Sequence, residues 1–397
     1  GLPVPYHGPN GVRWLMEQLA ERGWQVHRED DFPISLSRNG ASVSLEPGAQ
    51  FELSGAPFDA LESVAAEARD FGHDLDVLTA DLPVHQVALG FTPFANIHDL
   101  GWVPKGRYRI MRKYLAQTGY LAHHMMKGSC AIQASYDYAS QDDCATKVQL
   151  ATAVAPLTMA MFANSPLCLG KPSGWMSYRG QIWRNTDNDR SGFPDCIRQF
   201  SYERWVDYLL DVPMMFYFLN GQWTEAKGRT FRNWLENGHN SLFPTTSDWE
   251  LHVTSVFPEV RIKGSIEVRG ADCVGLSLAM AFVALFKGLF YCPTATSEAI
   301  ELANELEHYG TLSERFDIAS RLGLAGQVGN RRLSDWAERL VGCADRSLDR
   351  CAKGDHKWLK PLIKQISTGE SPGVSLLEGY QAAPKPETIF ELAHVLK

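Results

Sequence analysis

The chain has 397 residues, of which 45% are hydrophobic and 21% charged, and its formal net charge at pH 7 is −8. This composition excludes a disordered, a collagen-like or a small disulfide-rich protein, and the length suffices for one large hydrophobic core or two to three ordinary ones. The acidic balance, without a run of lysines or arginines, argues against nucleic acid as a partner, because neutralising its phosphates needs a basic surface.

The first eighty residues predict a helix, a short antiparallel sheet and a second helix. Apolar residues recur at helical spacing within residues 11–22. Residues 34–54 alternate between polar and apolar side chains around Asn39-Gly40, the strongest short hairpin signal. We therefore expect two antiparallel strands joined at Asn39-Gly40, a third strand over residues 50–54, and a helix over residues 58–78.

Helices and strands are both expected in the remainder of the chain. Helical patterns cover residues 105–126 and 142–162. Strand patterns cover residues 84–91, 129–138 and 262–269. From about residue 297 the chain is mostly helical and rich in charged residues, so the expected fold class is α+β.

No segment predicts a membrane span or a disulfide framework. The longest apolar stretch, residues 274–286, ends at Lys287 and is too short to cross a bilayer. The eight cysteines are scattered, without a C-x-x-C pair or a Cys/His cluster at zinc spacing. We therefore expect reduced thiols, a cytoplasmic location and no membrane partner.

Two acids of the predicted N-terminal sheet share one face. Glu46 and Glu52 have the opposite parity to Val43 and Leu45, so a sheet that buries the apolar pair directs both carboxylates to the other side. Neighbouring carboxylates repel one another unless a cation lies between them, and hard oxygen ligands suit Mg²⁺ that holds nucleotide phosphates. The alternative is a solvated strand face with glutamates at its edge.

Two later strand segments also have a polar face. Ala131, Gln133 and Ser135 lie on one side of the segment 129–138, and Glu267 shares a face with Arg269. This second pair would let the acid hold a metal while the guanidinium holds an adjacent phosphate or carboxylate. The alternative is a cross-strand ion pair on a wet sheet. The common phosphate-loop, dinucleotide, zincin and serine-hydrolase signatures are all absent from the sequence.

Six segments together resemble one known family. They are SLEPGAQFELSGAP, PKGRYRIMRKYL, MMKGSCAIQASYDY, MFANSPLCLGKPSGWMSYRGQIWRNTDNDRSG, DVPMMF and FPEVRIKGSIEVRGAD. In this order they are similar to the plant and proteobacterial type of glutamate-cysteine ligase, and the resemblance extends over roughly residues 5–380. That family belongs to the glutamine-synthetase-like carboxylate-amine ligases, in which a curved antiparallel β-sheet surrounded by helices forms a bowl-shaped active site.

The resemblance implies a reaction and its cofactors. ATP would phosphorylate the γ-carboxylate of L-glutamate, and the amino group of L-cysteine would then displace phosphate, giving γ-glutamylcysteine, ADP and phosphate. The implied metal is Mg²⁺, with Mn²⁺ as an alternative, and ATP is the co-substrate. We expect residues 1–397 to form a single catalytic domain with a helical C-terminal part, small-molecule substrates as partners, and a monomer or homodimer.

The resemblance also assigns roles to residues whose motifs match. Metal ligands are Glu46, Glu52 and Glu267. Nucleotide contacts are Gln133, Arg269 and Lys263. Contacts to the glutamate carboxylate are Arg107 and Arg179, and Arg179 and Arg269 are also implied in catalysis. Further substrate-facing positions are Ala131, Ser135 and Met215.

Three departures from the family pattern leave alternatives open. Ala131 and Ser135 stand where the family has a threonine and an asparagine, and Met215 replaces a tyrosine. Loss of polar partners usually changes which substrate is accepted, so a related ligase using a different amine or acid is an alternative. The family's opening strand with its E-H-E motif has no counterpart in residues 1–10. Either the given sequence begins late, or the chain is a catalytically silent binding or regulatory relative.

Overall fold

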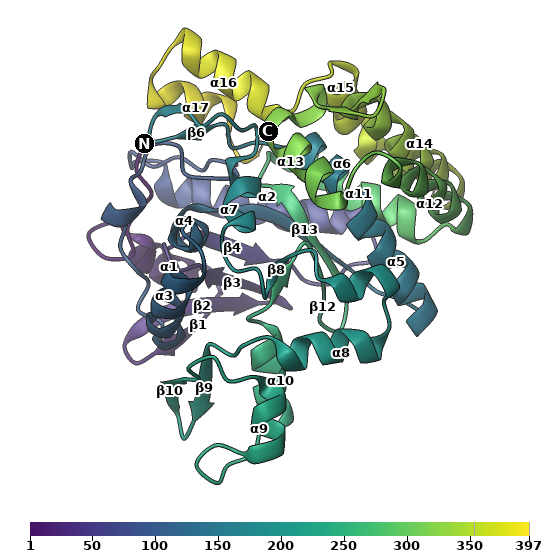
Figure 1. The fold of residues 1–397 in the computed structure, drawn as a ribbon. Helices are drawn as coiled ribbons and strands as arrows, with labels where there is room; N and C mark the ends of the chain where they lie inside the picture. Colours follow the sequence, from purple (N-terminus) through teal and green to yellow (C-terminus); the bar gives the residue numbers. More distant parts are fainter. Residues whose placement is uncertain (353, 397) are drawn as a thin grey trace.

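The computed structural model describes residues 1–352 and 354–396, and it has the expected α+β character (Figure 1). The helices are α1 (Val12–Glu21), α2 (Leu61–Thr79), α3 (Gly106–Thr118), α4 (Ala122–Gly128), α5 (Gln141–Ala153), α6 (Ala155–Phe162), α7 (Tyr178–Arg184), α8 (Tyr202–Asp211), α9 (Phe231–Asn237), α10 (Thr246–Val253), α11 (Leu276–Phe290), α12 (Pro293–Glu307), α13 (Leu312–Leu322), α14 (Leu333–Cys351), α15 (Lys360–Ser367), α16 (Pro372–Ala382) and α17 (Pro386–Leu392). Short 3-10 helices are η1 (Ile97–Asp99), η2 (Asp195–Gln199), η3 (Gly323–Ala325) and η4 (Asp355–Leu359).

Two of the sheets have more than two strands. The strands are β1 (Gln25–Glu29), β2 (Phe32–Arg38), β3 (Ala41–Leu45), β4 (Phe51–Ser54), β5 (Ala131–Tyr136), β6 (Leu167–Cys168), β7 (Lys171–Pro172), β8 (Ser191–Gly192), β9 (Phe216–Leu219), β10 (Gln222–Glu225), β11 (Phe257–Pro258), β12 (Val260–Ile262), β13 (Ile266–Asp272), β14 (Gln327–Val328) and β15 (Arg331–Arg332). A four-stranded sheet has the order β1-β2-β3-β4, and a three-stranded sheet has the order β12-β13-β5. Figure 1 shows both in the middle of the molecule, with the C-terminal helices above them.

The N-terminal sheet follows the sequence pattern closely. Asn39 and Gly40 both have positive φ, 52° and 86°, as a tight hairpin turn between β2 and β3 requires. Val43 and Leu45 are completely buried and pack with α1 and α2. The other face of the sheet is therefore left for polar side chains, as the parity argument predicts.

Several predicted elements are absent or are divided in the structure. The predicted strand 84–91 is not a strand, since it forms only isolated bridges from Val87 and Phe91. The predicted helix 105–126 is two helices, α3 and α4, because the chain at Gly119 approaches the backbone carbonyls of another segment so closely that a side chain would clash. The predicted helix 142–162 is divided into α5 and α6, where Pro156 lies in the first turn of α6 and supplies no backbone N–H.

The predicted strand 262–269 is a hairpin. Gly264 has φ +74°, and the chain reverses there so that Ile262 of β12 pairs with Ile266 of β13. The largest core cluster lies under this sheet and includes residues of α5, α6, α11, α12 and α14. From Pro293 onward the chain is mostly helical, as predicted. The described residues thus form separate four-stranded and three-stranded sheets rather than one continuous sheet.

Within the described residues no single helix has the length and apolar character to cross a bilayer, and α11 with α12 meets these criteria only as a pair bent by 100°.

Candidate active site

The turn between β3 and β4 orients Glu46 and Glu52. Ser44 lies opposite Glu52 in the ladder, and Glu46 N–H donates to the Gln50 carbonyl at 3.0 Å. Directly opposed residues and residues two apart share a face. Both glutamates therefore lie on the polar face of the sheet, and neither carboxylate is hydrogen-bonded or ion-paired to another described residue.

Gln50 joins this turn to the second sheet. Its side-chain amide donates to the carbonyls of Met126 at 3.2 Å and Ser129 at 3.1 Å, at the entrance to β5. Gly48 is required beside it because a Cβ there would clash with the backbone of Lys127. Gln50 belongs to one of the six segments that resemble the family, but the sequence predicted no role for it. Its hydrogen-bond partners are about eighty residues away in the chain, and no local pattern reveals such contacts.

The second sheet contributes Gln133, Glu267 and Arg269. Glu267 pairs with Ser135 across the β13–β5 ladder. Arg269 Nη1 donates to Gln133 Oε1 at 2.8 Å and to Glu267 Oε1 at 3.1 Å. The ladder has a bulge between Val268 and the residues that follow, and a bulge of this kind redirects a side chain.

Arg261 of β12 was missed by sequence reasoning. It lies opposite Glu267, and its Nε donates to Glu267 Oε2 at 2.7 Å. Both oxygens of Glu267 are thus held by arginines, so the cross-strand ion pair considered as an alternative does form. The predicted single strand 262–269 left residue 261 outside the sheet and hid this partner.

Electrostatic interactions connect the two sheets. The pKa of Glu52 is raised to about 7, mainly by burial; the neighbouring charges of Glu46 and Glu267 act in the same direction, and that of Arg269 opposes them. Burial alone would also raise the pKa of Glu267, but Arg269 and Arg261 outweigh it and hold that pKa below its ordinary value. The three predicted metal ligands are therefore close enough to interact.

The donor set suits a divalent cation that is shared with a substrate. Glu46 and Glu52 are neighbouring carboxylates that form no ion pair with another described residue, whereas Glu267 is paired with Arg261 and Arg269. Within residues 1–352 and 354–396, no three acidic, histidine or cysteine side chains are grouped as a complete metal site. A cation held by two carboxylates completes its coordination with water and phosphate oxygens.

Helix α3 contributes cations beside these acids. Lys105 Nζ donates to the Leu45 carbonyl at 2.9 Å, and burial lowers the pKa of Lys105 to about 8, with the charge of Arg107 acting in the same direction. The Arg107 guanidinium lies 5.3 Å from the ring centre of Tyr108. Partial burial lowers the pKa of Lys263, and Arg107 is among the cations that lower it further. Arg107 and Lys263 thus border the same site; Lys105 was not predicted.

Arg179 lies beneath the site rather than at its surface. It is 3% exposed, its Nη2 donates to the Arg269 carbonyl at 3.0 Å, and its Nη1 is 3.7 Å from Asp272 Oδ1. Arg179 Nε and Nη1 form no hydrogen bond with the described residues, and neither does the buried Oε2 of Glu259. The role of Arg179 toward a substrate carboxylate stays a prediction; in the structure its guanidinium contacts the backbone of Arg269 and the carboxylate of Asp272.

The three positions that differ from the family pattern have two kinds of surroundings. Ala131 and Ser135 lie along β5 on the face that carries Gln133. Met215 is 2% exposed and packs in a hydrophobic cluster with Phe91 and other apolar residues. Its expected substrate contact is therefore not seen, because its side chain belongs to the core.

This combination of features defines a class of enzyme. An acid pair without counter-ions, facing arginines and lysines on the polar faces of two sheets, can bring anionic substrates together around a divalent cation. A family model described as glutamate-cysteine ligase family 2 (GCS2) matches residues 1–391. The chain belongs to this family, and it is accordingly an ATP-dependent ligase that requires a divalent metal and acts on small molecules.

Curated relatives agree over most of the chain. A protein of Brassica juncea named "Glutamate--cysteine ligase, chloroplastic" is 35% identical over 375 residues, which cover 92% of this chain and 72% of the relative. "Glutamate--cysteine ligase B, chloroplastic" of Oryza sativa subsp. japonica is 34% identical over 389 residues, or 96% and 77%. The relative in Arabidopsis thaliana is 34% identical over 375 residues, or 92% and 71%.

These names also correct one expectation. We expected a cytoplasmic protein from the scattered cysteines. The relatives are each named as chloroplastic, so that expectation is wrong. A cysteine pattern reports the redox state of a compartment, and it does not separate one reducing compartment from another.

Proposed function

We propose that the polar faces of the two sheets form the site at which this ligase joins the γ-carboxylate of L-glutamate to the amino group of L-cysteine, with ATP converted to ADP and phosphate. The observation that carries the proposal is the proximity of Glu46 and Glu52 to Glu267 and Arg269, which come from separate sheets. Burial and, after it, repulsion from Glu46 raise the pKa of Glu52 to about 7, and a bound cation would relieve this cost of ionising the pair.

The chemistry needs both charge neutralisation and orientation. A carboxylate is a poor electrophile, so phosphorylation by ATP gives it a leaving group before the amine attacks. Mg²⁺ is the proposed cation because two carboxylates plus phosphates and water match its usual coordination, and when bound it would neutralise phosphate charge. Arg269, held by Gln133 and Glu267, presents a fixed guanidinium to the phosphates, and exposed Lys263 adds a second cation.

The remaining roles follow from burial. Arg107 is the proposed contact for a carboxylate of glutamate, since its charge acts on Lys263 and it therefore borders the site. Arg179 is proposed as a positioning residue that acts through the backbone of Arg269, because it is buried and donates to that carbonyl. Ala131 and Ser135 line the face on which the acceptor amine would lie.

The fold supports a finer architectural proposal. The two sheets, joined through Gln50, would act together as a bowl-shaped active site of the glutamine-synthetase type, within a single catalytic domain over residues 1–397. Helices from α12 onward would support it from behind, since α12, α14 and α15 contribute to the core cluster under the second sheet.

An ADP-release assay tests the function. With glutamate, ATP and Mg²⁺ we expect turnover with cysteine, and Glu52→Gln should reduce kcat by roughly 10²-fold or more, the usual effect of removing one electrostatic contact to reacting groups. Glu21→Gln, at the exposed end of α1, is the matched control and should retain full turnover. Near-normal turnover of Glu52→Gln would show that this face of the sheet does not take part in the reaction.

One observation favours a second candidate. Ala131 and Ser135 offer fewer polar groups than the threonine and asparagine of the family pattern, so the site is less suited to hold a polar acceptor. Replacing cysteine with a panel of other amines in the same assay decides between the two. Higher kcat/KM with an amine other than cysteine would reassign the acceptor while retaining the ligase chemistry.

A further inference from the structure

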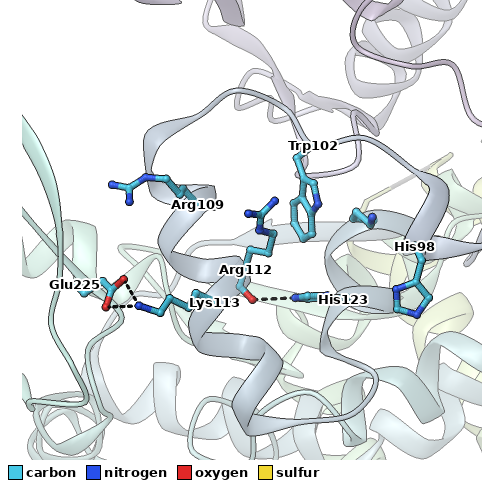
Figure 2. Close-up of a pocket in the computed structure, with 8 residues that line it drawn as sticks. His98, Trp102, Arg109, Arg112, Lys113, His123 and Glu225 are labelled. Atoms are coloured by element: carbon cyan, nitrogen blue, oxygen red, sulfur yellow. Dashed lines mark hydrogen bonds and ion pairs between the residues drawn. The ribbon is translucent and has the colours of Figure 1, made fainter.

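A cleft outside the proposed active site has a strongly basic lining. It lies between α3, the segment that contains η1, α4 and the end of β10, with a cavity volume of about 510 Å³, within the range of small-molecule pockets. Figure 2 shows Arg109, Arg112 and Lys113 of α3 facing it together with Trp102 and Glu225. The complete lining is His98, Trp102, Arg109, Arg112, Lys113, His123, Lys127 and Glu225.

The charges that line this cleft do not balance. Four lysines or arginines face one acid, Glu225, whose carboxylate is paired with Lys113 at 2.9 and 3.2 Å. Three positive charges therefore remain, although the chain as a whole carries −8. A cavity with concentrated charge of one sign attracts ligands of the opposite sign.

The guanidinium groups of the two lining arginines are not bonded to protein oxygens of the described residues. Among the described residues, no hydrogen bond or ion pair joins the guanidinium groups of Arg109 or Arg112 to an acidic or carbonyl oxygen. The backbone carbonyl of Arg112 accepts a hydrogen bond from His123 Nε2 at 2.8 Å (Figure 2). A guanidinium group can donate two parallel hydrogen bonds to the oxygens of one phosphate or carboxylate. Two such groups, one helical turn apart, are available to one ligand.

Trp102 fixes the cations in place. The Arg112 guanidinium lies 5.3 Å and Lys127 Nζ 4.8 Å from its ring centre. Lys127 is 3% exposed and donates to the Leu100 carbonyl at 2.7 Å, so its ammonium is anchored within the wall. Two cations near one indole repel each other, and an anion between them would reduce that repulsion. The ring is occupied by these cations, so it offers no free platform for a nucleobase.

The cleft is separate from the proposed active site. Successive residues of an α-helix are turned by about 100°, so Arg107 and Arg109 point in nearly opposite directions from α3. Arg107 faces Lys263 and the second sheet, whereas Arg109 lines the cleft. A ligand in the cleft would touch none of the acids or arginines assigned to the reaction, so its binding does not depend on the proposed function.

We propose that this cleft binds a small molecule that carries a diphosphate group. A terminal phosphate carries about −1.5 to −2 charges at neutral pH and the inner phosphate of a diphosphate ester about −1, so a diphosphate matches the three unbalanced cations, and its oxygens match two adjacent guanidinium groups. The diphosphate alone is the recognised element, because Trp102 is covered by Arg112 and Lys127.

Titration calorimetry with inorganic pyrophosphate tests the proposal. The full chain is titrated in EDTA, so that no metal bridges the ligand to Glu46 or Glu52. We expect binding to wild type, a loss of roughly tenfold or more in affinity in the double variant Arg109→Ala/Arg112→Ala, and no change in Arg69→Ala, an exposed arginine on α2. Glu225→Gln removes the only acid of the lining and should strengthen binding severalfold.

Further arms identify the site and the source of the diphosphate. Binding should persist in Arg269→Ala, which removes the phosphate contact proposed for the active site. In Arg269→Ala, where the proposed nucleotide contact of the active site is removed, ADP should bind no more tightly than pyrophosphate, since no base platform is free in the cleft. Absence of pyrophosphate binding, equal affinity in the double variant, weaker binding in Glu225→Gln, or citrate binding as tightly as pyrophosphate would each overturn the proposal. The double variant should keep wild-type ADP release with glutamate and cysteine.

Discussion

The pKa of Glu52 makes the stability of the metal-free protein depend on pH. A carboxyl whose pKa rises from 4.5 to about 7 on folding binds its proton more tightly in the folded state. Below pH 4.5 the group is protonated in both states and has no effect. As pH rises from 4.5 to 7 the folded state is progressively disfavoured, because it must ionise a buried acid beside Glu46.

The magnitude follows from the same values. At about 1.4 kcal/mol per pH unit, the ionised form above pH 7 lowers the free energy of unfolding by at most roughly 3 kcal/mol. Glu52→Gln takes up no proton and carries no charge. We therefore expect this variant to be more stable than wild type at pH 8 by up to that amount, and equal to wild type at pH 4.

Urea unfolding at the two pH values, with and without Mg²⁺, is the assay. If Glu46 and Glu52 hold the cation, Mg²⁺ at a hundredfold excess over its Kd stabilises wild type at pH 8 by about 2.7 kcal/mol and stabilises Glu52→Gln much less. Glu21→Gln, remote from the site, should follow wild type. Equal stability of wild type and Glu52→Gln at pH 8, or equal Mg²⁺ effects on both, would refute this reasoning.

Three further substitutions test other parts of the site. Arg179→Ala removes the cation that is paired with the buried carboxylate of Asp272 and whose charge also acts on the buried Glu259, so urea unfolding should show a loss of roughly 3–5 kcal/mol; a loss below 1 kcal/mol would contradict the buried pairing. Arg107→Ala should raise the glutamate KM in steady-state assays while the ATP KM stays the same, and an unchanged glutamate KM would count against its assignment. Gly48→Ala forces the β3–β4 turn away from the Lys127 backbone and should lower both stability and turnover, whereas retention of both would show that the close approach is dispensable.

Local sequence patterns correctly predicted those elements whose ends are set by residues within the element or next to it. The hairpin at Asn39-Gly40 formed because these two residues tolerate positive φ, and alternation placed Glu46 and Glu52 opposite the buried Val43 and Leu45. Prediction failed where a remote contact decides the conformation. Gly119 divides a helical pattern because another part of the chain packs against it.

The sequence by itself determined which side chains share a strand face and, through its motifs, the family to which the chain belongs. It could do so because side-chain alternation is a property of the local backbone, and because motif residues are recognisable one segment at a time. The tertiary structure alone decided that Gln50 links the two sheets, that Arg261 holds Glu267, and that Arg179 lies buried under Arg269. These relations join segments far apart in the chain, and their energy depends on burial and distance, which exist only once the chain has packed.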